Sequence, residues 1–333
     1  MQLSIVVPVY KSAECLPELV RRVEEEVTPN IQSYELILVN DDSPDSSWEV
    51  ILRLTPEHNL TGVNLRRNSG QDNAIMAGLQ VATGEVVVIM DDDLQHDPSD
   101  IVALYEQIKC GFDVVYAHFA HKEQAFWKNL GSWFSDRVAV RTLGKPKNIY
   151  MSPYKALRRN VVQEVTKYTG PYPYVDGLIF EVTSKITQVP ATHHLRFSGK
   201  SNYNFVRSIR VWLKLATGFS AFPLRLVAWV GATMSLLAFL LAGFFVLYAL
   251  IWSREPEGWV SAIVAILFIG GLQLIGIGAV GEYVGRIFVT QNARPQFAVR
   301  EICRSRAAED QDVGRRNHVT SVVHLASFGI NEE

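Results

Sequence analysis

Short apolar runs alternate with stretches of helical spacing from residue 1 to about residue 120. The apolar runs predict strands at Leu3–Val9, Glu35–Val39, Thr61–Leu65, Glu85–Met90 and Asp113–Tyr116. The stretches between them predict helices at Ala13–Val27, Ser46–Leu54, Gln71–Ala82 and Pro98–Lys109. Strands and helices in strict alternation are typical of an α/β protein with a doubly wound parallel sheet.

Two long uncharged runs dominate the second half of the chain, from Leu226 to Trp252 and from Trp259 to Gly281. Each can cross a hydrocarbon core of about 30 Å, which needs roughly 20 helical residues. Residues 253–258 between them are too few for a domain, so we expect a two-helix transmembrane hairpin with spans at 226–252 and 259–285. The alternative is a helical pair buried in a soluble core, which the flanking tryptophan and arginine residues disfavour.

Basic residues flank the two uncharged runs on their outer sides. They are Arg207, Arg210, Lys214 and Arg225 before the first run, and Arg286, Arg294, Arg300, Arg304 and Arg306 after the second. The loop between the runs has one arginine and two glutamates. Because positive charge marks the cytoplasmic side, we expect a multi-pass protein of the cytoplasmic (inner) membrane, with its globular domain and both termini in the cytoplasm.

Residues 205–222 combine large apolar side chains with basic ones at helical spacing. This pattern, directly before an uncharged run, predicts an amphipathic juxtamembrane helix over 205–225 that lies on the membrane surface. The alternative is an ordinary surface helix. The expected order is therefore a globular domain at 1–204, this helix, the two spans, and a cytoplasmic tail at 286–333.

The bulk composition excludes several classes of protein. The 333 residues allow about two domains, and a formal net charge of −2 gives no overall attraction to nucleic acid. Cys15, Cys110 and Cys303 are scattered without metal-ligand spacing, which indicates reduced thiols in a cytosolic compartment. The first residues have no basic region before their short apolar run, so they predict a strand and not a signal peptide.

Polar residues stand where four of the predicted strands end. The segments are Pro8-Val9-Tyr10, Asn40-Asp41-Asp42, Arg66-Arg67-Asn68 and Asp91-Asp92-Asp93. Ligands of open α/β sheets bind beyond the carboxyl ends of the strands, so these segments fit a nucleotide-sugar pocket. Residues 1–204 contain neither Gly-x-Gly-x-x-Gly nor a Gly-x-x-x-x-Gly-Lys-Ser/Thr loop, which disfavours dinucleotide and P-loop sites.

Three consecutive carboxylates, Asp91, Asp92 and Asp93, follow the apolar run that ends at Met90. Side chains two apart on a strand share a face, so Asp91 and Asp93 can converge on one divalent cation, which prefers carboxylate oxygens. Such an ion would hold a diphosphate and neutralise the charge on a departing nucleotide. The alternative is a solvated acidic turn after a strand.

The order of these pieces resembles glycosyltransferase family 2. The matching segments are Val6-Val7-Pro8-Val9-Tyr10, Val39-Asn40-Asp41-Asp42-Ser43-Pro44-Asp45, Arg67-Asn68-Ser69-Gly70-Gln71 with Ala74-Ile75-Met76-Ala77-Gly78, Met90-Asp91-Asp92-Asp93-Leu94-Gln95, Arg196-Phe197-Ser198-Gly199-Lys200-Ser201-Asn202-Tyr203 and Gly281-Glu282-Tyr283-Val284-Gly285-Arg286. Within the family, the chain resembles the bacterial polyprenyl-phosphate glycosyltransferases, which include relatives of dolichyl-phosphate mannose synthase and the undecaprenyl-phosphate glucose and aminoarabinose transferases. The resemblance extends from residue 1 to about residue 300.

The resemblance implies a GT-A (Rossmann-like) nucleotide-sugar-binding domain and a role for each matching position. The residues implied at the nucleotide are Pro8, Tyr10, Asp41, Arg67, Gln71 and Asp92. Asp91 and Asp93 would bind Mg²⁺ or Mn²⁺, with Asp93 and Gln95 close to the diphosphate and the acceptor phosphate. The residues implied at phosphate oxygens of the acceptor are Arg196, Lys200, Ser201, Tyr203 and Lys155. A metal ion and a guanidinium group both suit developing diphosphate charge.

Several of these positions also have a plain structural interpretation. In this interpretation Pro8 ends a strand, and Asp41 or Asp45 caps the helix near Ser46. In the same way, Arg67 would be a surface residue. Arg196 would pair with a local carboxylate.

The chain departs from the family pattern in three places. The Asn-Glu that follows the Pro-Val-Tyr motif in the family is Lys11-Ser12 here, which bears on donor contacts. An aspartate common in relatives is missing from the segment 149–155, where Lys155 stands at an arginine position. The lysine of a common Ser-Lys-Tyr phosphate motif is Asn202, for which the nearby Lys200 would compensate.

The missing aspartate does not imply loss of a catalytic base. A polyprenyl monophosphate has its second pKa near 6, so it is largely a dianion at neutral pH and needs orientation more than deprotonation. If a base exists, Asp176 is the best candidate among the remaining residues. The alternative for Asp176 is a carboxylate that caps a turn.

The sequence thus predicts an inverting, metal-dependent transfer of a hexose-type sugar from a nucleotide sugar, most simply UDP-linked, to a polyprenyl (undecaprenyl) phosphate. Glycines in the second run (Gly270, Gly271, Gly276, Gly278 and Gly281) allow close helix packing, so we expect a homo-oligomer. A processive polysaccharide synthase is disfavoured, because the chain has no Gln-x-x-Arg-Trp motif and too few spans. Two alternatives are a non-catalytic membrane partner that retains the fold and a membrane-anchored transferase that acts on a soluble or polysaccharide acceptor.

Overall fold

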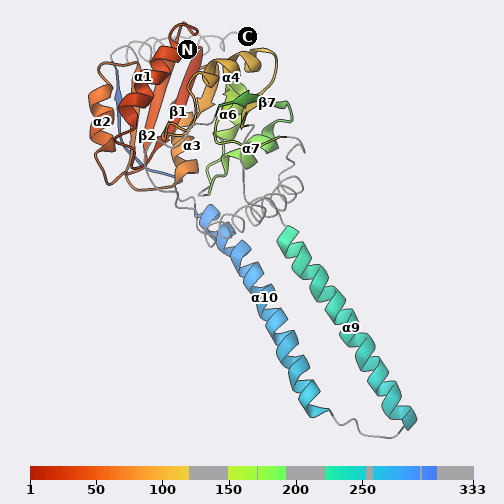
Figure 1. Cartoon of the computed structure of the whole chain (residues 1–333). Helices are drawn as coiled ribbons and strands as arrows, with labels where there is room; N and C mark the ends of the chain where they lie inside the picture. The colour runs from red at the N-terminus through yellow and green to blue at the C-terminus, as the bar shows by residue number, and fades with distance from the viewer. Residues whose placement is uncertain (120–148, 171, 193–221, 253–257, 293–294, 306–333) are drawn as a thin grey trace, which may run out of the picture. The chain divides into compact units, whose positions relative to one another are not determined.

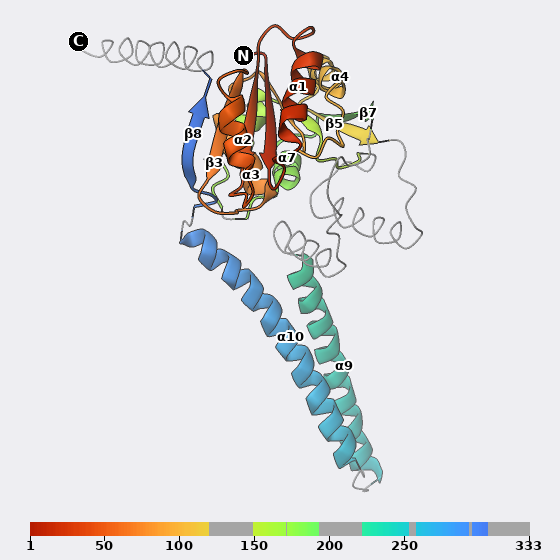
Figure 2. The same cartoon turned by 60° about the vertical axis from the view of Figure 1, so that its left-hand side comes forward.

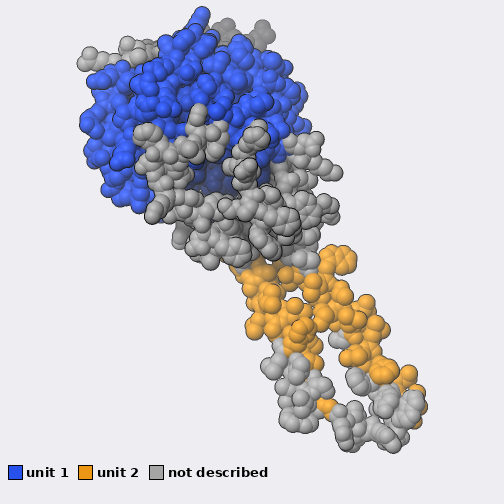
Figure 3. Space-filling view, in the orientation of Figure 1, with its two compact units in different colours: residues 1–131, 144–202, 295–333 blue, residues 132–143, 203–294 orange. Residues whose placement is uncertain are grey.

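The computed structural model describes residues 1–119, 149–170, 172–192, 222–252, 258–292 and 295–305. The chain divides into two compact units, coloured separately in Figure 3. The first consists of residues 1–131, 144–202 and 295–333, and the second of residues 132–143 and 203–294.

The first unit contains the strands and helices that the apolar pattern predicts, with small shifts at their ends. Its strands are β1 (Leu3–Val9), β2 (Tyr34–Asn40), β3 (Leu60–Leu65), β4 (Val86–Ile89), β5 (Val114–Phe119), β6 (Lys155–Arg158), β7 (Ile186–Ala191) and β8 (Val299–Arg304). Its helices are α1 (Leu16–Val27), α2 (Ser47–Leu54), α3 (Gln71–Val81), α4 (Asp100–Lys109), α6 (Arg159–Val165) and α7 (Val175–Val182). Helix α1 begins at Leu16, three residues later than predicted, because Pro17 favours the first turn of a helix.

The strands form one eight-stranded sheet in the order β7-β5-β6-β4-β1-β2-β3-β8. Figure 1 shows strands β1 and β2 of this sheet together with the helices of the same unit. Strands β4, β1, β2 and β3 are parallel, as predicted. The prediction of a purely parallel sheet is wrong, because β6 is antiparallel to both β4 and β5, and β8 is antiparallel to β3. The fold is therefore α/β with a mixed sheet.

Helices cover both faces of this sheet. Helix α1 contacts α2 and α4 on one face, while α3 contacts α7 on the other. The side chains of Leu3, Ile5 and Val7 belong to the core on the α1 side, and Val6, between them, faces α3. Helix α3 approaches β1 closely at Gly78, where an added Cβ would lie 2.3 Å from Val6 Cγ1. Glycine is required there by space and not by backbone conformation.

The edge strand β8 corrects the prediction of a tail over residues 286–333. Val299–Arg304 pairs with β3, and Figure 2 shows β8 beside β3. In this pairing Gly62 lies opposite Cys303, and Val63 lies opposite Ile302. Gln296 is buried and donates from Nε2 to the carbonyl oxygen of Tyr168 at 2.8 Å. This part of the chain is thus integral to the sheet, since it completes the hydrogen bonding of β3.

The second unit contains two long helices, α9 (Phe222–Trp252) and α10 (Trp259–Gln291), which contact each other. Within the described residues, one window is long and apolar enough to cross a membrane: Phe268–Gly285 in α10, with mean hydropathy 1.3 and no buried residue. In α9 the apolar stretch is shorter, Val227–Leu241. Of the two spans that the sequence predicts, one therefore has a candidate helix by length and composition. Most of the predicted juxtamembrane helix (205–221) lies outside the described residues.

Candidate active site

The strand order places a topological switch point between β1 and β4. The chain proceeds from β1 to β2 and β3 on one side, and then returns to form β4 on the other side of β1. In open α/β sheets, ligands bind at the carboxyl ends of the strands at such a point. Here those ends carry Tyr10, Lys11 and Ser12 after β1, and residues 90–95 after β4. The predicted site residues that follow β1 and β4 therefore lie at the same edge of the sheet.

Asp92 joins the two loops at the switch point. Its Oδ2 accepts the backbone N–H of Tyr10 at 3.0 Å and the hydroxyl of Ser12 at 2.5 Å. Burial raises the pKa of the Asp92 carboxyl, and these hydrogen bonds offset part of that rise. One of the departures from the family pattern, Ser12, thus has a role here: it helps to fasten the loop after β1 to the loop after β4.

Asp91 and Asp93 lie in this loop and not on the strand, because β4 ends at Ile89. The argument that strand alternation aligns them is therefore wrong. Asp91 Oδ1 accepts an N–H of the Gln71 side chain at 2.8 Å, and Asp93 Oδ1 accepts the backbone N–H of Gln95 at 3.2 Å. The loop bends sharply where Leu94 takes a left-handed conformation, with φ of 59°. Loop geometry, together with the contact from α3, places the two carboxylates.

His96 was not singled out from the sequence, yet it contacts the carboxylate loop directly. Its Nδ1 accepts the backbone N–H of Asp91 at 3.1 Å, and the residue is 3% exposed. A lone histidine in a polar loop gives no signal in a single sequence. Only the fold shows that it lies beneath the carboxylates.

Asp41 fastens the loop after β2 to the loop before α3. It is 4% exposed, and its two carboxylate oxygens accept the backbone N–H groups of Ser69 at 2.7 Å and Gly70 at 2.8 Å. Gly70 has φ of 91°, which favours glycine, so the loop has a conformation that turns both N–H groups toward Asp41. The contact of Asp41 with a nucleotide stays a prediction.

The start of α2 is held by Asp45, whose Oδ1 accepts both the N–H and the hydroxyl of Ser47.

Burial also raises the pKa of the Asp41 carboxyl, against the effect of its two N–H donors. A raised pKa in the folded state means that Asp41 stabilises the fold most below pH 3.8, and that this contribution is lost as pH rises through the raised pKa. The unfolding free energy of wild type relative to Asp41→Asn should therefore fall as pH rises from 3.8 through the raised pKa. Denaturant unfolding across this range would check it, with Glu57→Gln, an exposed carboxylate, as the control. A difference that does not change with pH would contradict it.

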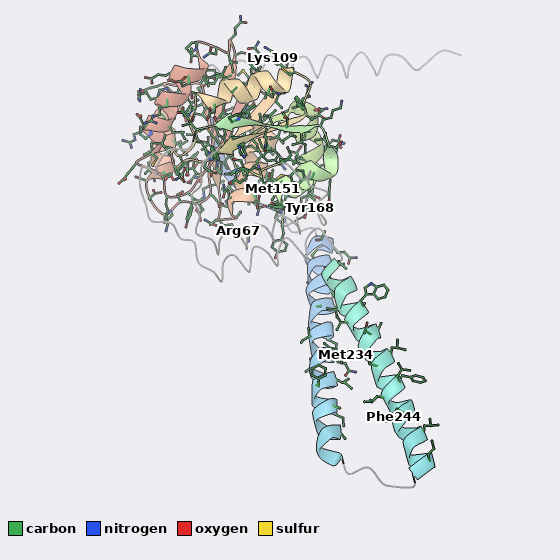
Figure 4. All side chains as sticks on the ribbon, turned by 45° about the vertical axis from the view of Figure 1, so that its right-hand side comes forward. Arg67, Lys109, Met151, Tyr168, Met234 and Phe244 are labelled. Carbon is green, nitrogen blue, oxygen red and sulfur yellow. The ribbon has the colours of Figure 1, made fainter. Side chains whose placement is uncertain are left out.

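The remaining nucleotide residues differ in exposure. Pro8 is buried within β1, opposite Val39 of β2. It is close to the site because it lies one residue before the end of β1. Tyr10 is 45% exposed, and the Lys11 ammonium lies 5.3 Å from the centre of its ring. Arg67 is exposed at the end of β3 and is labelled in Figure 4.

Lys155 and Asp176, two candidates for acceptor chemistry, contact each other. The Lys155 ammonium pairs with Asp176 Oδ1, and the side chains are 3% and 16% exposed. The hydroxyl of Tyr116 donates to the same oxygen at 2.8 Å. Asp176 lies in the first turn of α7 without capping it, so the alternative role as a cap is wrong. Arg196, Lys200, Ser201 and Tyr203 lie outside the described residues.

The donor set at the switch point fits a hard divalent cation with few protein ligands. The described residues contain no group of three or more His, Cys, Asp or Glu side chains that would enclose a metal. Mg²⁺ in proteins commonly has one or two carboxylate ligands and completes its shell with phosphate oxygens and water. Asp91 and Asp93 match that pattern, since both are half-buried and have neutral donors from Gln71 and Gln95.

Comparison with known proteins gives matches along most of the chain. The profile of the family described as Glycosyl transferase family 2 matches residues 4–166. An undecaprenyl-phosphate 4-deoxy-4-formamido-L-arabinose transferase from Yersinia enterocolitica is 32% identical over 313 residues, covering 93% of this chain and 96% of the relative. The protein of the same name from Yersinia pestis is 32% identical over 317 residues, covering 94% and 97%.

Among solved structures, glucosyl-3-phosphoglycerate synthase from Mycobacterium tuberculosis, in complex with Mn²⁺ and UDP-glucose, superposes with a TM-score of 0.49. It is 14% identical and covers 65% of this chain and 77% of that chain.

The fold, the carboxylates at the switch point and the family match define a glycosyltransferase of the GT-A class. The chain belongs to glycosyltransferase family 2, and the resemblance inferred from its motifs is confirmed. It spans almost the full length of the relatives that it matches.

Proposed function

We propose that this enzyme transfers a hexose-type sugar from a nucleotide sugar, UDP-linked, to a polyprenyl (undecaprenyl) phosphate. The observation that carries the proposal is the 32% identity, over 93% of this chain, to a relative named as an undecaprenyl-phosphate sugar transferase. A match of that length extends well beyond the sheet and its helices into the apolar part of the chain. We propose that the reaction takes place at the cytoplasmic face of the membrane.

The surfaces of α9 and α10 support an acceptor that is embedded in lipid. Large apolar side chains are exposed on both helices, among them Trp229 (72% exposed), Phe239 (78%) and Leu274 (70%). Contiguous exposed apolar surface marks membrane or protein contacts, because exposing it to water is unfavourable. We therefore propose that α9 and α10 together span the membrane as a hairpin, with both termini in the cytoplasm. Self-association through the glycines of α10 stays a prediction.

At the donor side, we propose that Asp91 and Asp93 hold Mg²⁺ or Mn²⁺. When bound, the ion supplies neutralising charge to the diphosphate of the leaving nucleotide. Gln71 orients Asp91 through its side-chain amide, and Asp92 keeps the two loops of the site together. The other residues proposed for the donor are Pro8, Tyr10, Asp41 and Arg67.

In the proposed reaction, a phosphate oxygen of the acceptor attacks the anomeric carbon from the face opposite the nucleotide. A new carbon–oxygen bond forms as the bond to the diphosphate breaks, so the configuration inverts. The acceptor is largely a dianion at neutral pH, because its second pKa is near 6, and it therefore needs orientation more than a base. The residues proposed to orient it are Gln95, Arg196, Lys200, Ser201 and Tyr203.

The test is a donor panel with the purified full-length protein, undecaprenyl phosphate and Mg²⁺ or Mn²⁺. The panel contains radiolabelled UDP- and GDP-hexoses and a nucleotide-linked 4-deoxy-4-formamido-L-arabinose, the sugar in the names of the relatives. We expect label in chloroform-extractable lipid from one donor, dependent on both the metal and the polyprenyl phosphate. Label in a water-soluble product other than the donor, when a soluble or polysaccharide acceptor is supplied, would favour that acceptor. Absence of transfer from every donor to any acceptor would favour a non-catalytic partner.

A further inference from the structure

His96 is held against the backbone of the carboxylate loop by a hydrogen bond whose direction is fixed. A backbone N–H can only donate, so the Nδ1 that accepts from Asp91 carries no proton. The tautomer inferred from this bond is the neutral ring with its proton on Nε2. His96 therefore acts toward Asp91 as a neutral hydrogen-bond acceptor, through Nδ1.

Two aromatic rings fix the orientation of the imidazole. His96 stacks on Phe119, with 5.6 Å between ring centres and 7° between planes, and on Tyr154, with 4.9 Å and 14°. The Tyr154 hydroxyl donates to the carbonyl oxygen of Asp97 at 2.9 Å, so this ring is itself tied to the carboxylate loop. Packing of this kind holds the Nδ1 lone pair in one direction, toward the N–H of Asp91.

The position of this bond along the chain gives it a consequence for the carboxylates. The last ladder bond of this strand joins the N–H of Met90 to the carbonyl oxygen of Val6. The next N–H, that of Asp91, is directed to His96 instead. At Asp91, where the loop begins, the backbone N–H is therefore bonded by His96 and not by a neighbouring strand. This hydrogen bond fixes the backbone from which the Asp91 carboxylate projects. Gln71 fixes the carboxylate itself.

We propose that His96 is a positioning residue of the divalent-cation site, acting through the N–H of Asp91. The inference rests on the proposed function, because it takes Asp91 and Asp93 as the ligands of the cation. Groups that orient metal ligands typically change metal affinity by about 10- to 100-fold when they are removed. An effect of that size is expected here, because the bond to His96 fixes the backbone from which the Asp91 carboxylate projects.

The test compares two amides at position 96. In His96→Asn, the side-chain oxygen takes the position of Nδ1 and can accept from Asp91, whereas in His96→Gln it lies one bond further out. Mn²⁺ binding to the purified full-length protein with UDP is measured by the loss of the free Mn²⁺ signal in electron paramagnetic resonance. We expect His96→Gln to weaken Mn²⁺ binding about 10- to 100-fold and His96→Asn to stay within about threefold of wild type. Thermal midpoints are recorded for both variants.

Equal Mn²⁺ affinities for the two folded variants would overturn the inference while the proposed function stands. Wild type that binds no Mn²⁺ with UDP would overturn the metal site and this inference together. If neither variant folds, Mn²⁺ binding is measured with Tyr154→Phe instead. This change keeps the ring that stacks on His96 and removes only the hydrogen bond to Asp97. Weaker Mn²⁺ binding in Tyr154→Phe supports the inference, and unchanged binding overturns it.

Discussion

Replacing Asp93 with asparagine is expected to lower sugar transfer to polyprenyl phosphate by about 10³-fold, with no loss of folded protein. A factor of 10³ corresponds to about 4 kcal/mol of transition-state stabilisation, a size typical of groups that stabilise developing charge. The substitution keeps the shape of the side chain and an oxygen that can accept the N–H of Gln95. It removes the negative charge, which is what a divalent cation needs from this position.

The matched control is Asp97→Asn, which removes the same charge from the same loop. Asp97 Oδ1 accepts the N–H of Ser99 at the start of α4, and an asparagine oxygen can do the same. We expect Asp97→Asn to transfer sugar at close to the wild-type rate. Initial rates of lipid labelling and thermal midpoints would be measured for both variants. Full activity in Asp93→Asn would contradict the proposed cation site and favour a protein whose function does not depend on catalysis.

Asp92 provides a second contrast within the same three carboxylates. Its carboxylate accepts hydrogen bonds from Tyr10 and Ser12 on the neighbouring loop, so its contacts are with protein groups. Asp93 Oδ1, by comparison, accepts the N–H of Gln95, which lies two residues away in the same loop. Three adjacent aspartates that look alike in the sequence therefore have different contacts in the fold.

The apolar pattern predicts the central strands well, because each buried parallel strand is a short, continuous apolar run. Strands β1 to β4 and the helices between them occur where the pattern places them. The polar residues at the strand ends also meet as expected, since parallel strands share one carboxyl edge. The general position of the site therefore follows from local pattern and a simple rule of topology.

Long-range pairing could not be predicted in this way. Strand β8 reads Val-Arg-Glu-Ile-Cys-Arg, a charged edge strand without clear alternation, and it lies more than 200 residues after its partner β3. Its role depends on contacts such as that between Cys303 and Gly62, where an added Cβ would lie 2.5 Å from the sulfur. Nothing local to residues 299–304 carries that information.

The contacts of single polar residues are equally hidden. Whether Asp41 binds a ligand or a loop depends on the conformation of Ser69 and Gly70, which a motif does not record. The same holds for His96 and for the pairing of Lys155 with Asp176. The sequence indicates that such residues can bind a ligand or take part in catalysis. The fold determines whether their side chains face a ligand or contact other protein groups.

Breaking the ion pair between Lys155 and Asp176 is expected to cost about 3 to 5 kcal/mol of folding free energy, because it leaves one buried charge without its partner. Lys155 lies opposite both Ile89 and Tyr116 in the sheet and is 3% exposed. Burial and the charge of Asp176 raise the pKa of Tyr116 well above its usual value, so its hydroxyl stays protonated and donates to Asp176. In Lys155→Met, the Asp176 carboxylate would keep only neutral donors among these groups.

The double variant Lys155→Met/Asp176→Asn should recover most of this loss, since it removes both charges and keeps an oxygen that accepts from Tyr116. Denaturant unfolding of wild type, both single variants and the double variant gives the coupling energy. The exposed pair Lys109 and Glu106, at 3.1 Å, serves as the control and should show no measurable coupling.

The same four proteins decide whether Asp176 is a catalytic base. If the pair is structural, transfer activity should follow stability, and the double variant should regain both. If Asp176 removes a proton from the acceptor, Asp176→Asn should be inactive with Lys155 or with Met at position 155, whatever its stability. Because the acceptor phosphate is already ionised at neutral pH, we expect the first result.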